Sequence, residues 1–153
     1  MKLLKPFAAL GFAFLAAFGA AQSNVPPTLK LQFPSSAKHG VKVEGTLVVT
    51  FGPGLHAYQN PASDPDLIPV AVTVTTKGVT LKPVKYPAGK NMSVGGDPKP
   101  VKVYGGSISI PLSVVVPKKG KINLAVNFHY QQCNPNSCYP PSDETASATI
   151  TVK

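Results

Sequence analysis

Residues 122–130 read Ile-Asn-Leu-Ala-Val-Asn-Phe-His-Tyr, so that large apolar side chains alternate with smaller or polar ones. A period of two is typical of a β-strand with one face against a core and the other toward solvent. We expect the face of Ile122, Leu124, Val126, Phe128 and Tyr130 to be buried. Residues 145–152 repeat the pattern, with Ala, Ala, Ile and Val at the even positions and Thr or Ser at the odd ones.

The rest of the chain after residue 21 consists of short runs rich in Val, Ile, Thr, Leu and Tyr, broken by Gly and Pro. No helical period is visible, so the pattern predicts strands and turns. Further strands are expected near residues 28–33, 41–51, 55–58, 68–75, 80–86, 102–104 and 107–116. Eight or nine short strands predict an all-β fold, an immunoglobulin-like antiparallel β-sandwich. Residues 59–66 and 87–100 are too rich in Pro and Gly to be strands, and the second segment is long enough to suggest a functional loop.

The N-terminus has the three parts of a secretory signal peptide. Basic residues at positions 2 and 5 precede an apolar run from Phe7 to Phe18, and the small residues Gly19-Ala20-Ala21 follow. The apolar run is shorter than the ~20 residues that a membrane-spanning helix needs, which disfavours an uncleaved anchor. We therefore predict that residues 1–21 are a signal peptide and that residues 22–153 form one domain. The expected product is a stand-alone monomer in the periplasm or outside the cell, with no stable membrane insertion after cleavage.

The positive charge does not indicate a nucleic-acid partner. The 153 residues carry a formal net charge of +9, and all 15 basic residues are lysines. Arginine, which makes the bidentate contacts to phosphate and guanine, is absent. The lysines are scattered along the chain except for Lys118, Lys119 and Lys121. Solvated strand faces and hairpin tips explain this distribution better than a nucleic-acid surface.

Cys133 and Cys138 are the only cysteines, and the Asn-Pro-Asn-Ser segment between them has strong turn chemistry. A tight turn can bring two α-carbons to the ~5.5 Å typical of a disulfide, which would form in an oxidising compartment. A structural staple is one hypothesis, although so short a loop gives only ~2 kcal/mol of stabilisation. A bridge that is opened and reformed in thiol–disulfide exchange is the second. A metal site that adds His56 or His129 is a third, disfavoured because zinc prefers four ligands.

The segment around the cysteines resembles the active-site segment of a known family. Residues 130–133 (Tyr-Gln-Gln-Cys), a short polar turn and residues 138–141 (Cys-Tyr-Pro-Pro) resemble the N-terminal, immunoglobulin-like periplasmic domain of the thiol:disulfide interchange protein DsbD. Residues 54–58 (Gly-Leu-His-Ala-Tyr), 86–87 (Tyr-Pro) and 103–106 (Val-Tyr-Gly-Gly) resemble further segments of that domain, in the same order. The resemblance extends over essentially all of residues 22–153.

The resemblance implies that Cys133 and Cys138 are a catalytic redox pair in a protein-disulfide reductase component. Such a module relays electrons from a thioredoxin-like donor to disulfide-containing periplasmic acceptor proteins and uses no metal or other cofactor. The family attacks its partners with the second cysteine, which corresponds to Cys138. The alternative is a non-enzymatic binding or structural module of the same fold with an inert disulfide.

Three residues are candidates for tuning the cysteine pair. We expect Tyr58 and Tyr139 to pack beside the sulfurs, and His56 to act as a proton acceptor or as a cation that favours thiolate. Tyr58 would equally fit a half-buried strand as an ordinary core residue. His56 would equally fit an exposed position on a strand.

In the DsbD family a loop with acidic and aromatic residues at its tip covers the disulfide as a cap. The matching segment here, residues 90–98, has one acid, Asp97, and no aromatic residue. Met92 and Val94 are the apolar residues that could act as a lid. This departure predicts weaker shielding of the disulfide.

Overall fold

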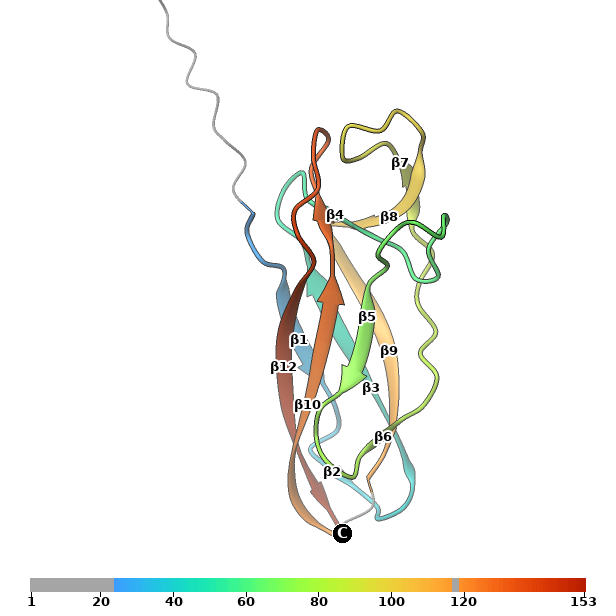
Figure 1. The fold of residues 1–153 in the computed structure, drawn as a ribbon. Coiled ribbons are helices and arrows are strands. Elements are labelled where there is room, and N and C mark those ends of the chain that lie inside the picture. Colours follow the sequence, from blue (N-terminus) through green and yellow to red (C-terminus); the bar gives the residue numbers. More distant parts are fainter. Residues whose placement is uncertain (1–23, 117–118) are drawn as a thin grey trace, which may run out of the picture.

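The computed structural model describes residues 24–116 and 119–153, and in this part of the chain every regular element is a β-strand (Figure 1). No helix in the described residues has the length and apolarity needed to cross a membrane. The predicted signal peptide, residues 1–21, lies outside the described residues. The strands are β1 (Thr28–Gln32), β2 (Ser36–Ala37), β3 (Lys42–Thr50), β4 (His56–Tyr58), β5 (Ala71–Val74), β6 (Thr80–Leu81), β7 (Lys90–Met92), β8 (Val101–Gly105), β9 (Ser107–Val115), β10 (Gly120–Tyr130), β11 (Gln132–Cys133) and β12 (Ser142–Val152).

The strands form three four-stranded sheets with the orders β1-β3-β9-β6, β2-β12-β10-β5 and β11-β4-β8-β7. The two long antiparallel pairs, β3 with β9 and β10 with β12, run along the long axis of the molecule and belong to different sheets (Figure 1). The third sheet lies at one end of the molecule, beyond the ends of β5 and β10 (Figure 1). The fold is the expected immunoglobulin-like antiparallel sandwich, with β2 and β12 as a short parallel pair.

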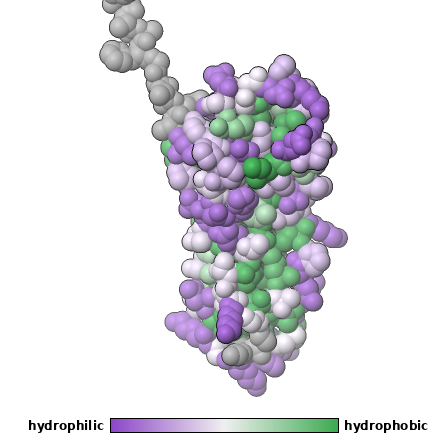
Figure 2. Space-filling model, in the orientation of Figure 1, coloured by the Kyte–Doolittle hydropathy of each residue, from purple (hydrophilic) through white to green (hydrophobic). Residues whose placement is uncertain are grey.

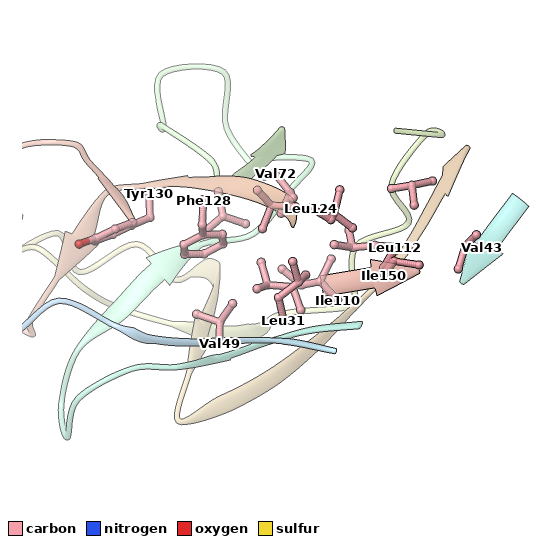
Figure 3. Packing of buried hydrophobic residues seen from close by; sticks show 14 of the residues in the cluster. Leu31, Val43, Val49, Val72, Ile110, Leu112, Leu124, Phe128, Tyr130 and Ile150 are labelled. Atoms are coloured by element: carbon pink, nitrogen blue, oxygen red, sulfur yellow. The ribbon is translucent and has the colours of Figure 1, made fainter. Parts of the chain in front are cut away.

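The core lies between the two long sheets. The apolar side chains that alternate along residues 122–130 point into it. Leu124, Val126 and Phe128 have no exposed surface, and the Phe128 ring stacks on Tyr130 with centroids 5.6 Å apart (Figure 3). Ile150 of β12 is equally buried. The predicted buried face is therefore confirmed, with Ile122 half-buried at the end of the strand. On the face seen in Figure 2, hydrophilic residues are widespread, and apolar residues are visible along the middle and toward the upper end.

Two predicted boundaries are wrong. The strand expected over residues 80–86 ends at Leu81, because Pro83 has no N–H to donate to a ladder. The segment 87–100, expected to contain no strand, includes the three-residue strand β7, which pairs with β8. This strand is at the edge of its sheet, so it needs ladder hydrogen bonds on one side only and tolerates the Pro- and Gly-rich surroundings.

Candidate functional site

The two cysteines form a disulfide across the turn that follows β10. The S–S distance is 2.03 Å and the α-carbons are 3.9 Å apart, closer than the ~5.5 Å expected from the sequence. Two backbone hydrogen bonds flank the pair, from Tyr139 N to Gln132 O at 2.8 Å and from Asn134 N to Ser137 O at 2.9 Å. Cys133 and Cys138 therefore occupy a non-hydrogen-bonded antiparallel position, where facing α-carbons approach most closely.

Asn134 holds the turn between the cysteines. Its side-chain oxygen accepts hydrogen bonds from the backbone N–H groups of Asn136 and Ser137, both at 2.8 Å. Its Nδ2 donates to the phenolic oxygen of Tyr139 at 3.1 Å. The structure thus places Tyr139 against the turn, next to Cys138 in sequence, and its predicted role beside the sulfurs stays a prediction.

The two cysteines differ sharply in exposure. Cys133 lies in β11, is 1% exposed and belongs to a small buried cluster with Tyr58, Val94 and Val103. Cys138 follows the turn and is an exposed residue. Cys138 is therefore the more accessible of the two residues, and Gly95 lies against its sulfur.

Tyr58 lies beside both sulfurs. Its phenolic oxygen is 3.2 Å from Cys138 Sγ and 3.3 Å from Cys133 Sγ. Sulfurs in a disulfide carry no hydrogen, so the phenol is the donor. Burial raises the pKa of Tyr58 above its usual value, and the negative charge of Asp97 raises it further. The phenol therefore remains protonated and available as a donor at neutral pH.

His56 lies on the same sheet as the disulfide, one strand away from Cys133. It is paired in register with Cys133 on one side and with Gly105 on the other. A Cβ on Gly105 would come within 2.5 Å of the imidazole Cδ2, so the ring packs directly over this glycine. Burial lowers the pKa of His56, and the neighbouring Gly54 backbone offsets part of the effect. The lowered pKa favours the neutral imidazole at pH 7, which fits a proton acceptor better than a cation.

The loop that follows β7 lies over the disulfide and contacts it through its backbone. Gly95 N donates to Asn134 O at 2.8 Å, and Gly96 N donates to Pro135 O at 2.9 Å. A Cβ on Gly95 would lie 2.6 Å from Cys138 Sγ. Both glycines have positive φ, 70° and 83°, a conformation that L side chains rarely adopt.

The three predicted cap residues lie in different environments. Val94 is 3% exposed and packs in the cluster with Tyr58 and Cys133, and its role as an apolar lid stays a prediction. Met92 is 38% exposed on β7 and lines a groove with His56 instead. Asp97 is at the end of the loop, where its Oδ1 accepts a hydrogen bond from the backbone N of Lys99 at 2.8 Å.

Gly95 and Gly96 lie within the cap segment expected from the sequence, residues 90–98, but had no role assigned to them. The Gly-Gly pair was visible as a signal for positive φ, but which groups its backbone touches depends on how residues 93–98 fold back onto the turn at 134–137. No group of three or more His, Cys, Asp or Glu residues that could hold a metal ion occurs within 24–116 and 119–153.

The fold and the site define an all-β domain in which the turn after β10 carries a disulfide between a buried and an exposed cysteine. The backbone of the loop after β7 lies against this disulfide. The sequence profile of the N-terminal domain of the thiol:disulfide interchange protein DsbD matches residues 22–150, and the chain belongs to this family. The resemblance to this family that the sequence indicated is thereby confirmed. No curated protein sequence matches the chain.

Two solved structures are similar to this chain. The N-terminal periplasmic domain of ScsB from Proteus mirabilis matches with a TM-score of 0.58 at 13% identity, over 81% of this chain and 46% of that one. The N-terminal domain of Neisseria meningitidis DsbD in the reduced form matches with a TM-score of 0.46 at 12% identity, over 80% of this chain and 86% of that one. The chain thus spans less than half the length of the ScsB structure. At these identities the ScsB match supports the fold alone.

Proposed function

We propose that this chain is an exported thiol–disulfide exchange protein that relays electrons through Cys133 and Cys138 to disulfides of other extracytoplasmic proteins. A thioredoxin-like protein would supply the electrons, and the chain would act as a component of a protein-disulfide reductase. Residues 1–21 would direct export and be cleaved off after Ala21, leaving residues 22–153 as one periplasmic domain. The family membership supports the chemistry, and the description of the ScsB domain as periplasmic supports the location.

The arrangement around Tyr58 is the observation that carries this proposal. An exposed Cys138 is bonded to a buried Cys133, and one protonated phenol lies within hydrogen-bond distance of both sulfurs. In the reduced state the same phenol would donate to a thiolate, which is the reactive form of cysteine. A purely structural bridge has no need of a donor placed in this way.

The proposed reaction proceeds in two exchanges. The thiolate of Cys138 attacks one sulfur of a partner disulfide, forms a mixed disulfide and releases the other partner sulfur as a thiolate, which takes up a proton. Cys133 then loses its proton and attacks the Cys138 sulfur, so that the Cys133–Cys138 bond forms again and the second partner thiol leaves. Two electrons pass from the chain to the partner. A thioredoxin-like dithiol reverses these steps to reduce the chain again.

The reduction potential of the disulfide tests the proposal. Equilibration with glutathione and dithiothreitol buffers should give a value of about −200 mV, within reach of thioredoxin-like donors. A value well below about −300 mV would identify a structural bridge and favour the alternative, an inert disulfide in a binding module. Cys133→Ala should then trap a mixed disulfide through Cys138, and Cys138→Ala, which leaves the buried cysteine, should trap much less.

A further inference from the structure

A groove of about 310 Å³ opens on the sheet that carries the disulfide. It is lined by His56, Lys90, Met92, Val103, Gly105 and Gly106. Its volume is at the lower end of the range for ligand pockets, so it suits a single large side chain better than a whole small molecule. Gly105 leaves room for the His56 imidazole, and a Cβ on Gly106 would meet nothing within 4 Å, so this wall of the groove is open.

The groove is adjacent to the disulfide. Cys133, His56 and Gly105 are directly paired across β11, β4 and β8, so their side-chain positions share one face of the sheet. With strands about 4.8 Å apart, Gly105 is roughly 10 Å from Cys133. His56 lies between the disulfide and the groove.

The outer wall of the groove belongs to an exposed edge strand. β7 is the terminal strand of its sheet, and all three of its residues are exposed. Met92 is one of three large hydrophobic residues exposed in the described part of the chain. The strand runs directly into the loop whose Gly95 lies against Cys138, so a segment bound along β7 would point toward the disulfide.

The rim of the groove is basic. Lys90 lines it, and no acidic residue does. Asp64 pairs with Lys99, with an N–O distance of 3.1 Å, and Asp97 accepts a hydrogen bond from the Lys99 backbone. Within the described residues Lys90 has no ion pair, which leaves its charge for a binding partner.

From this groove we infer a recognition site for the protein partner of the exchange reaction. The occupant is an extended segment of a disulfide-bearing protein, with an apolar or aromatic side chain in the groove and an acidic side chain against Lys90. Its cysteine then lies at Cys138. The inference rests on the proposed function and assigns to it a substrate class, acidic–apolar segments next to a cysteine.

Three symmetric tripeptide disulfides serve as probes. The first carries glutamate and phenylalanine beside each cysteine, the second has lysine in place of glutamate, and the third has alanine in place of phenylalanine. The reduced protein converts each probe into two thiol peptides while its own disulfide forms again, so the electrons balance. A small neutral disulfide, 2-hydroxyethyl disulfide, reports exchange without recognition.

The first probe should react about twofold to fivefold faster than either of the other two, as expected for one exposed ion pair or one partly buried side chain. In Lys90→Glu the preference for glutamate over lysine should be lost or reversed. In Met92→Ala the ratio of the reaction rates with the phenylalanine and alanine probes should fall toward one. Lys77→Glu, which makes the same charge change in a distant turn, should retain both preferences.

The outcomes separate the two proposals. Equal rates with all three peptides, together with normal reaction of 2-hydroxyethyl disulfide, would overturn the recognition site and leave the exchange function intact. Preferences that persist unchanged in Lys90→Glu and Met92→Ala would also overturn it. Failure to react with any disulfide would overturn the exchange function, and with it the recognition site. Thermal unfolding of each variant confirms that the compared proteins are folded.

Discussion

The phenolic oxygen of Tyr58 is almost equidistant from the two sulfurs of the disulfide, 3.2 Å from Cys138 Sγ and 3.3 Å from Cys133 Sγ. Because Tyr58 is buried at 7% exposure, water competes little for its hydrogen bond. The position of Tyr58 follows from its register opposite Val103 in β8. One donor can thus serve whichever sulfur carries negative charge when the bridge opens.

Tyr58→Phe should raise the pKa of the attacking thiol in the reduced protein. Hydrogen bonds to charged groups are worth about 1.5–3 kcal/mol, which corresponds to an increase of roughly 1 to 2 in the pKa. Titration of the thiolate by its ultraviolet absorbance measures this pKa directly. The rate of exchange at neutral pH should fall in parallel, because a smaller fraction of the thiol is ionised.

Tyr104→Phe is the matched control for this substitution. Tyr104 is also a buried tyrosine, but its hydroxyl donates to Pro87 O at 2.7 Å, and its neighbour in β4 is Ala57. This variant should lose about 1 kcal/mol of unfolding free energy and keep the thiol pKa of the wild type. An equal thiol pKa in wild type and Tyr58→Phe would contradict the role given to Tyr58.

Reduction of the disulfide should leave the sandwich folded. The bond closes a loop of only a few residues, so the chain-entropy model gives a loss of about 2 kcal/mol. The core between the two long sheets contains neither cysteine. Urea unfolding followed with and without dithiothreitol measures the difference, and loss of the folded baseline on reduction would point to a structural staple.

The sequence could predict the sandwich because its signal is local and repeated. The alternation over residues 122–130 defines a buried face that the structure confirms, and β12 shows the same pattern. The short strands are harder to predict from the sequence, because a strand such as β7 has three exposed residues and no alternation of apolar and polar side chains. Its existence depends on pairing with β8, which only the tertiary arrangement provides.

The candidate site could be predicted only in part for the same reason. The two cysteines and the turn between them are contiguous in sequence, so their proximity followed from turn chemistry. Tyr58 was a candidate because it fell in a segment resembling the family, although a core position was equally compatible. The backbone contact of Gly95 with Cys138 joins residues 43 positions apart, and no local pattern encodes it.

Asp143 should make stability depend on pH in the acid range. Hydrogen bonds from Asn127 Nδ2 at 2.7 Å and with His129 Nδ1 at 3.1 Å lower the pKa of this carboxyl below its ordinary 3.8. A carboxyl group whose pKa is lower in the folded than in the unfolded state stabilises the fold at pH values above its unfolded-state pKa. This stabilisation is lost as the pH falls through its folded-state pKa. The wild type should therefore melt at a higher temperature than Asp143→Asn at pH 6, and the difference should shrink toward pH 2.

Asp66→Asn provides the comparison for Asp143→Asn, since it removes one carboxylate in a loop without touching β10 or β12. Comparing the two variants at each pH distinguishes loss of the Asp143 hydrogen bonds from the general effect of removing one negative charge. A pH-independent difference for Asp143→Asn would show that the carboxylate does not stabilise the β10–β12 pair.

Gly95→Ala should open the cap over the disulfide. The added Cβ would meet Cys138 Sγ at 2.6 Å, and φ of 70° is unfavourable for alanine, so the loop must move away from the turn. Strain of this kind costs about 1–3 kcal/mol, and even 1 kcal/mol raises the open population roughly fivefold. Reduction of the oxidised protein by dithiothreitol should accelerate by about that factor.

Gly40→Ala is the control for Gly95→Ala. It distinguishes the effect of exposing the disulfide from the effect of backbone strain. Gly40 has almost the same φ, 69°, but a Cβ there meets nothing within 4 Å. Both variants should lose stability through the strained backbone, whereas only Gly95→Ala should change the rate of reduction. Equal rates for the two variants would show that the contact of Gly95 with Cys138 does not shield the bond, and slower reduction of Gly95→Ala would mean that the closed loop promotes the reaction. The predicted order, with Gly95→Ala faster than Gly40→Ala, follows if two backbone hydrogen bonds to Asn134 and Pro135 are what hold the cap closed.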